Sequence, residues 1–144
     1  MSTDKFFMRS CSAGLRRRMF FLCEPGGRAV GTVSAWYDNR PLSFSSEVGW
    51  GRIHWVAIVP EYQGRGLSKP MMTVAMNRLA ELHERAYLDT ATARLVAIKV
   101  YLDFGFLPGI RTDEDADRWR YVAEHLDHPA LADPGRWYDV RGDS

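Results

Sequence analysis

Two glycines separated by one residue, and followed by a segment with helical spacing, form the stretch of this chain whose chemistry is easiest to state. They lie between Gln63 and Ser68, in the run QGRGLS. A loop with two glycines lets the backbone approach a ligand closely, and the first amides of the following helix have no intrahelical partner. Such amides and the helix dipole attract anions, each charge contributing about 0.3–1 kcal/mol when exposed. The run therefore predicts a phosphate-binding loop.

The segments around this loop predict the elements that position it. Trp50 to Val59 reads as a strand in which polar and apolar residues first alternate, with Ile53 and Trp55 on one face, and then become continuously apolar. Such a strand is exposed at one end and buried at the other. Met71 to Arg85 predicts an amphipathic helix behind the loop, with Ser68 as its N-cap.

Shorter segments complete a predicted mixed sheet. Met19 to Cys23 and Arg28 to Tyr37 read as two strands, and the turn EPGG between them indicates an antiparallel hairpin. Ala86 to Thr90 is a short strand after the first helix, and this strand, helix, strand order implies a right-handed crossover to a parallel neighbour. The remaining predicted elements are a helix at Arg94–Phe104 with Gly105 as its C-cap, a strand at Phe106–Ile110 and a helix that starts at Thr112.

Length and composition indicate one globular domain over residues 1–144, with 1–18 as a weakly patterned arm and 127–144 as a loosely packed tail. Nineteen basic and eighteen acidic residues leave a formal charge of +1, which predicts neither nucleic acid nor a membrane surface as a partner. Cys11 and Cys23 have neither disulfide-scaffold nor zinc spacing and are interpreted as free thiols. No apolar run approaches the roughly 20 residues of a spanning helix, and there is no signal peptide, so a cytoplasmic protein is expected.

Two stretches of the chain resemble the GNAT superfamily of N-acetyltransferases. QGRGLS looks like the family's pyrophosphate loop, written Q/R-x-x-G-x-G/A, and AIKVYLDFGF from Ala97 to Phe106 is similar to its second signature, a helix with a tyrosine that ends in Gly-Phe. The resemblance covers roughly Met19 to Ile110. It implies an α/β fold of the GNAT type, with a mixed, mostly antiparallel sheet that has one splayed parallel pair and is flanked by helices.

The resemblance also implies a ligand and its contacts. Acetyl-CoA would be the acyl donor, no metal would be needed, and an amine would attack the thioester directly. The pantetheine arm would pair with Val56, Ala57 and Ile58, and an amide near Ile58 would polarise the thioester carbonyl. The implied pyrophosphate contacts are Gln63, Gly64, Arg65, Gly66, Leu67 and Ser68.

Direct attack requires a neutral amine, and a lysine-like amine lies roughly 3.4 pKa units above pH 7, which costs about 4.6 kcal/mol. His54 is the best-matched base on the strand, because its reference pKa is about 6.5; a hydrogen-bonded strand histidine without a catalytic role is the alternative. Arg52 stands where several histone-acetylating members carry a glutamate, and Glu47 in the preceding loop is a weaker candidate. Tyr101 matches the family tyrosine that donates a proton to the departing CoA thiolate; its alternative is a core aromatic residue.

The N-terminal region departs from the family pattern. Members usually place a strand and two helices before the hairpin, and the eighteen residues present here cannot hold all of them. Either the chain is a shortened member or another subunit supplies the missing wall of the acceptor pocket. The expected partners are therefore acetyl-CoA, an unidentified amine and, in the second case, another copy in a homodimer. The alternative function is a non-catalytic CoA-binding or interaction domain with a degenerate GNAT fold.

Overall fold

The computed structural model of the chain describes residues 6–10, 18–37 and 49–142. Cys11 and Glu47, both named above, lie outside these ranges. The described chain divides into two compact units, the first reaching to Leu88 and the second starting at Asp89. Each unit is described by itself below. That together they form the single domain predicted over residues 1–144 stays a prediction.

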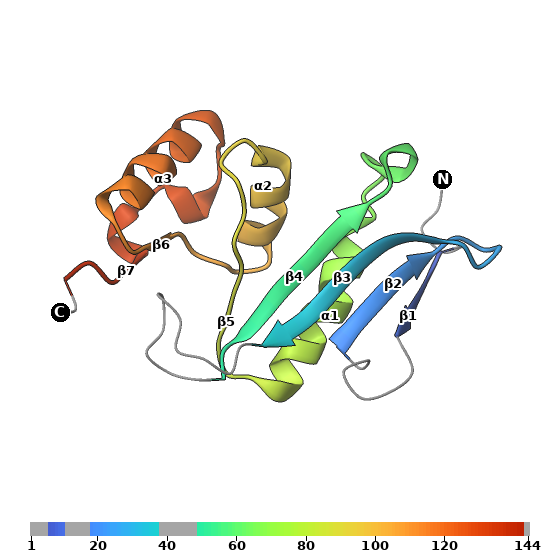
Figure 1. The fold of residues 1–144 in the computed structure, drawn as a ribbon. Coiled ribbons are helices and arrows are strands. Elements are labelled where there is room, and N and C mark those ends of the chain that lie inside the picture. The colour runs from blue at the N-terminus through green and yellow to red at the C-terminus, as the bar shows by residue number, and fades with distance from the viewer. Residues whose placement is uncertain (1–5, 11–17, 38–48, 143–144) are drawn as a thin grey trace. The chain divides into compact units, whose positions relative to one another are not determined.

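The first unit is built on a five-stranded sheet with the order β1-β2-β3-β4-β5 (Figure 1). Its strands are β1 (Phe7–Ser10), β2 (Met19–Cys23), β3 (Ala29–Tyr37), β4 (Gly51–Ile58) and β5 (Ala86–Tyr87). Neighbouring strands are antiparallel except β4 and β5, which are parallel. The predicted mixed and mostly antiparallel sheet with one parallel pair is confirmed.

The N-terminal part of the chain holds a strand that the sequence did not reveal. Residues 1–18 were expected to be a weakly patterned arm, but β1 pairs with β2 over four residues. The strand has no visible alternation because it lies at the edge of the sheet and its residues are mostly exposed. An edge strand of four residues therefore gives little periodic signal.

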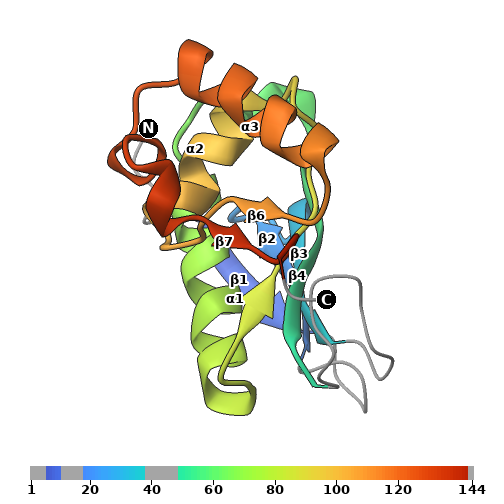
Figure 2. The ribbon, with the colours of Figure 1, turned by 90° about the vertical axis from the view of Figure 1, so that its left-hand side faces the viewer.

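Helix α1 (Ser68–Leu82) packs on one face of this sheet, along β3 and β4 (Figure 2). It lies three residues before the predicted range at each end, and it buries Met71, Met72, Ala75 and Leu79. The helix approaches β4 very closely at Gly51. A Cβ atom at that position would lie 2.7 Å from the Cδ2 atom of Leu79 and 3.0 Å from the imidazole of His83, so any larger residue would displace these side chains.

The second unit contains α2 (Leu95–Asp103), α3 (Asp113–His125) and a two-stranded parallel sheet of β6 (Gly109–Ile110) and β7 (Tyr138–Asp139). Two short 3-10 helices, η4 (Pro129–Leu131) and η5 (Pro134–Arg136), connect α3 to β7. Its core is formed by Ile98, Leu102, Val122 and Leu131, with Trp119 and Trp137 packed against them. No helix in the described part of the chain is long and apolar enough to span a membrane.

Residues 127–142 are not the loosely packed tail that the sequence suggested. Leu131 is only 5% exposed within the core of the second unit. The indole Nε1 of Trp137 donates a hydrogen bond to the carbonyl oxygen of Ala130 at 3.1 Å, and β7 pairs with β6. The Pro-, Gly- and Asp-rich sequence forms short capped 3-10 helices here. The two apolar residues that hold it to the core, Leu131 and Trp137, do not recur at a regular spacing and therefore give no periodic signal.

Candidate functional site

Strand β4 contains a β-bulge in the middle of its pairing with β3. The register shifts by one residue between Thr32 and Ser34, which leaves Trp55 and Val56 of β4 opposite a single residue of β3. Trp55 has a φ of +54° and is the only non-glycine residue in the described ranges with a positive φ. A bulky residue in this region is strained, and such strain persists where the surrounding structure enforces it, often at functional sites.

One edge of β4 lacks a strand partner over most of its length. Strand β5 pairs with β4 only at Gly51 and Arg52, so within the described chain β3 is the sole strand paired with β4 from Ile53 onward. At the point of pairing, the guanidinium of Arg52 lies 5.5 Å from the ring centre of Tyr87. The predicted splayed pair is therefore present. That Val56, Ala57 and Ile58 bind pantetheine along this edge stays a prediction.

His54 lies immediately before the bulge. It pairs with Ser34 of β3, whose hydroxyl is fully buried and has no hydrogen-bond partner among the described residues. The imidazole and indole rings of His54 and Trp55 meet edge to face, with centroids 4.8 Å apart. His54 is itself partly exposed, which a base that exchanges protons with solvent requires. Its predicted role as the general base stays a prediction.

The glycine loop follows β4 through a short 3-10 helix, η3 (Pro60–Tyr62). The side-chain Nε2 of Gln63 donates a hydrogen bond to the carbonyl oxygen of Ile58 at 2.8 Å, so this side chain closes the turn between strand and loop. Gly64 and Gly66 have φ values of +74° and +73°, which L side chains rarely adopt. A Cβ atom at either position would meet nothing within 4 Å, so the space beside the loop is open.

Tyr62 of η3 connects the glycine loop to the turn between β2 and β3. Its hydroxyl donates a 2.6 Å hydrogen bond to Oε2 of Glu24, which raises the pKa of Tyr62. The guanidinium of Arg65 lies 4.8 Å from the centre of the same ring. A second contact joins the same two segments, since Arg28 and Glu61 form an ion pair at 3.7 Å. The hairpin turn therefore braces the loop.

Helix α1 begins directly behind the loop without a side-chain cap. Its N-cap residue is Leu67, so the predicted N-cap Ser68 is instead the first helical residue. Leu67 is only 2% exposed, because its side chain fills the core, and it cannot accept a hydrogen bond from the helix. No acidic residue occurs in the first turn, whereas Lys69 places a cation there. The amides at this end are available to an anion.

The second unit holds Tyr101 on α2. The helix ends in a Schellman motif, in which the amide of Phe106 donates to the carbonyl oxygen of Tyr101 at 3.3 Å and the amide of Gly105 donates to that of Leu102 at 3.0 Å. Gly105 has a φ of +95°, as the motif requires. Partial burial raises the pKa of the Tyr101 phenol, although the charge of Arg94 opposes the effect. The hydroxyl is therefore protonated at neutral pH.

An Asp–His pair in the second unit resembles a catalytic dyad but is structural. Nε2 of His128 lies 2.8 Å from Oδ1 of Asp103, and Nδ1 of His128 accepts a hydrogen bond from the amide of Ala130 at 3.1 Å. Both imidazole nitrogens are thus engaged, and neither offers a lone pair to a substrate. The hydrogen bonds from His128 and Lys99 lower the pKa of Asp103. The pair fastens η4 to α2.

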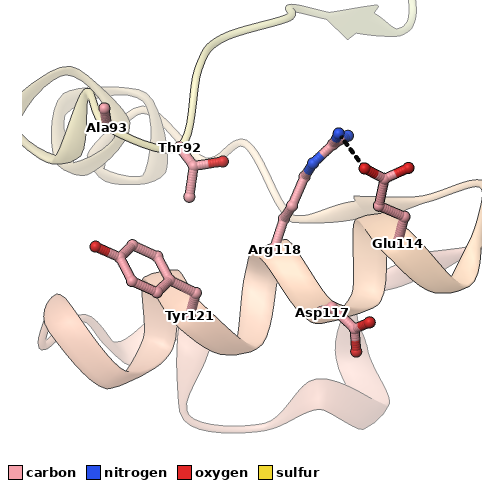
Figure 3. A pocket seen from close by; sticks show the side chains of 6 residues that line it. All are labelled: Thr92, Ala93, Glu114, Asp117, Arg118 and Tyr121. Carbon is pink, nitrogen blue, oxygen red and sulfur yellow. Dashed lines mark hydrogen bonds and ion pairs between the residues drawn. The ribbon is translucent and has the colours of Figure 1, made fainter.

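A shallow pocket of about 450 Å³ opens on the second unit between α3 and the segment before α2 (Figure 3). Arg118, which points into it, is neutralised by Glu114 at 2.6 Å. None of the residues predicted for the site lines this pocket. The lining residues are Thr92, Ala93, Glu114, Asp117, Arg118 and Tyr121.

Two features of the first unit were not predicted from the sequence. The alternation in β4 placed Trp55 on the same face as Ile53, but Ile53 is 3% exposed and Trp55 is 68% exposed. The bulge breaks the alternation, and it depends on pairing with β3 rather than on local sequence. The Tyr62–Glu24 contact was also missed, because the two residues lie 38 positions apart. No local motif signals either feature.

Comparisons with known proteins give one family match. The profile of the acetyltransferase (GNAT) family matches residues 3–106. A search of curated proteins found no match.

Three solved structures illustrate the similarity. A protein from Exiguobacterium sp. 255-15 that is assigned as an acetyltransferase is 19% identical, with a TM-score of 0.47 over 61% of this chain and 52% of its own. An acetyltransferase of Trypanosoma brucei is 27% identical, with a TM-score of 0.46 over 61% and 60%. A spermidine/spermine N-acetyltransferase of Vibrio cholerae is 23% identical, with a TM-score of 0.46 over 63% and 50%. This chain thus spans between one half and three fifths of their lengths.

Proposed function

The chain belongs to the acetyltransferase (GNAT) family, and from this premise we propose that it transfers the acetyl group of acetyl-CoA to an amine by direct attack. The observation that carries the proposal is the N-terminus of α1, where backbone amides have no side-chain hydrogen-bond partner. An uncapped helix N-terminus without acidic residues lies behind a loop with two glycines in left-handed conformation. These features fit a phosphate-bearing substrate.

The residues of the first unit would divide the binding of acetyl-CoA between them. The backbone from Gln63 to Ser68 and the first amides of α1 would hold the pyrophosphate, and Lys69 would add positive charge. Val56, Ala57 and Ile58 would pair with the pantetheine arm along the edge of β4 that β5 leaves unpaired beyond Arg52. An amide near Ile58 would donate a hydrogen bond to the thioester carbonyl oxygen, where negative charge develops during attack.

The transfer then needs one base and one acid. His54 would take the proton from the ammonium form of the acceptor, and the neutral nitrogen would form a C–N bond with the thioester carbonyl carbon. After the attack the nitrogen loses its second proton to solvent, and as the tetrahedral intermediate collapses the C–S bond breaks and the sulfur leaves with its electron pair. The phenol of Tyr101, kept protonated by partial burial, would donate its proton to this thiolate. The products are the N-acetyl amine and CoA, and solvent restores both side chains.

The proposal is tested in two steps on the whole chain. Calorimetry with acetyl-CoA measures binding, and thiol detection measures CoA release across a panel of small amines, amino acids and peptides. We expect binding and turnover with at least one amine. Tyr101→Phe should lower kcat about 100-fold while the Kd for acetyl-CoA stays unchanged, because the phenol acts only on the departing sulfur.

Tyr121→Phe is the matched control, since Tyr121 is an exposed tyrosine of the same unit that takes no part in the proposed chemistry. Unchanged turnover in Tyr101→Phe would remove Tyr101 from the acid role. Binding of acetyl-CoA without release of CoA for any amine would show a CoA-binding domain instead of an enzyme. Absence of binding would refute both functions.

A further inference from the structure

The bulge of β4 places Trp55 in the left-handed region, where a tryptophan is conformationally unfavourable. The left-handed region costs a residue with a Cβ about 1–2 kcal/mol, and glycine or asparagine occupies it far more readily. Trp55 is 68% exposed, so its burial stabilises the first unit little. A large aromatic residue that is both strained and exposed is better explained by a ligand than by packing.

The neighbours of Trp55 restrict the kind of ligand. Its ring meets the imidazole of His54 edge to face at 4.8 Å, so a molecule on the indole face would be close to that imidazole. The sequence of β4, GRIHWVAI, contributes Arg52 and His54 and no carboxylate. A polycation would find no opposite charge on this strand. An uncharged aromatic ring would stack on the indole, which favours flat partners at centroid distances of about 4.5–7 Å.

Resting on the proposed function, we propose that Trp55 selects the acceptor, by stacking against an aromatic ring of an amine whose nitrogen is presented to His54. The residue would act on acceptor binding and not on acetyl-CoA, whose proposed contacts start at Val56. The bulge is what turns the indole outward, since regular alternation would place it on the same face as the buried Ile53. The strain at Trp55 would then serve substrate selection.

The test compares two amines of nearly equal size, 2-phenylethylamine and 2-cyclohexylethylamine, with spermidine as the polycationic amine. For the wild type we expect a kcat/KM that is about fivefold higher for the phenyl compound than for the cyclohexyl compound, and lowest for spermidine. Trp55→Leu keeps a strained side chain but removes the aromatic face. In this variant the phenyl preference should fall to about one, through the KM for the amine, while the KM for acetyl-CoA stays unchanged.

Two further variants separate binding from folding. Trp55→Gly relieves the strain and should melt at or above the wild-type temperature, although it loses the phenyl preference. Phe7→Leu removes another exposed aromatic side chain from the same sheet. It should change neither the melting temperature nor the preference for the phenyl compound.

Each outcome decides the inference. A wild type that acetylates amines without a phenyl preference, or a preference that survives in Trp55→Leu, overturns the acceptor role while the proposed function stands. A marked fall in the melting temperature of Trp55→Gly shows that Trp55 serves the fold and also overturns it. If no amine is acetylated, the proposed function fails and the acceptor role falls with it.

Discussion

Helices α1 and α3 each begin with backbone amides that need hydrogen-bond partners, and they meet this need differently. At α3 the hydroxyl of Thr112 accepts a hydrogen bond from the amide of Asp115 at 3.2 Å. The carboxylate of Asp115 in turn accepts from the amide of Arg111, the residue before the N-cap, at 3.0 Å. At α1 the N-cap is the buried Leu67, and no side chain caps the helix.

Charge reinforces the difference between the two helix ends. The first turn of α3 carries three acidic residues, at positions 113–115, which favour the positive end of the helix dipole. Although burial raises the pKa of Asp115, the hydrogen bonds and charge of Arg111 keep it below its usual value, so the carboxylate is ionised at neutral pH. The first turn of α1 has no acidic residue and contains Lys69. Helix α3 therefore satisfies its own terminus, whereas the terminus of α1 has neither a side-chain cap nor an acidic residue.

The largest expected effect comes from closing the loop in front of α1. Gly66→Val places a β-branched residue at a φ of +73° and a side chain in the open space beside the loop. We expect the Kd for acetyl-CoA to rise about 50-fold, because the valine side chain prevents the close approach of a phosphate and the strained loop leaves the conformation that the glycine allows. Titration calorimetry measures this change.

The control for this substitution is Gly49→Val. Gly49 also has a positive φ, of +104°, and no atom lies within 4 Å of its ideal Cβ. It should therefore lose a similar amount of stability while the Kd for acetyl-CoA stays within about twofold of the wild-type value. Equal losses of binding in both variants would contradict a specific role for the loop.

A smaller effect is expected when α1 receives the kind of charge that α3 already has. Ser68→Asp puts a carboxylate on the first helical residue, which should stabilise the folded state by about 0.3–1 kcal/mol. The same charge should repel phosphate and raise the Kd for acetyl-CoA about tenfold. Chemical denaturation should then show a higher free energy of unfolding, while calorimetry should show weaker binding of acetyl-CoA. Asn77→Asp adds the same charge to the exposed middle of α1 and should change neither quantity appreciably.

The sequence predicted those features that depend on interactions between residues close together in the chain. The loop, the helix behind it and the hairpin were predicted because glycines, turn residues and apolar spacing act over a few positions. The bulge at Trp55 depends on pairing with a strand about twenty residues earlier, and one edge of β4 is left unpaired because β5 pairs with β4 for only two residues. Neither property is encoded locally.

Two of the sequence predictions, the N-cap of α1 and the loose C-terminal tail, were wrong for the same physical reason. Ser68 is a good capping residue by type, but Leu67 takes the N-cap position because its side chain is needed in the core. The C-terminal segment looked unstructured, but Leu131 and Trp137 anchor it to the second unit. In both cases tertiary burial of a single apolar side chain outweighs the local preference. The predicted roles of His54 and Tyr101 concern chemistry, which burial and pairing do not determine.

The smallest effect, and the one that completes the comparison, is expected at α3. Thr112→Ala removes the hydroxyl that accepts from the amide of Asp115, and the loss of an N-cap typically costs about 1 kcal/mol. Because this end of the helix satisfies itself and binds no anion, the Kd for acetyl-CoA should not change. Thr112→Ser keeps an accepting hydroxyl and should retain most of the stability in denaturant unfolding. If Thr112→Ala weakened acetyl-CoA binding as much as Ser68→Asp, the two helix ends would not have the separate roles that their caps and charges indicate.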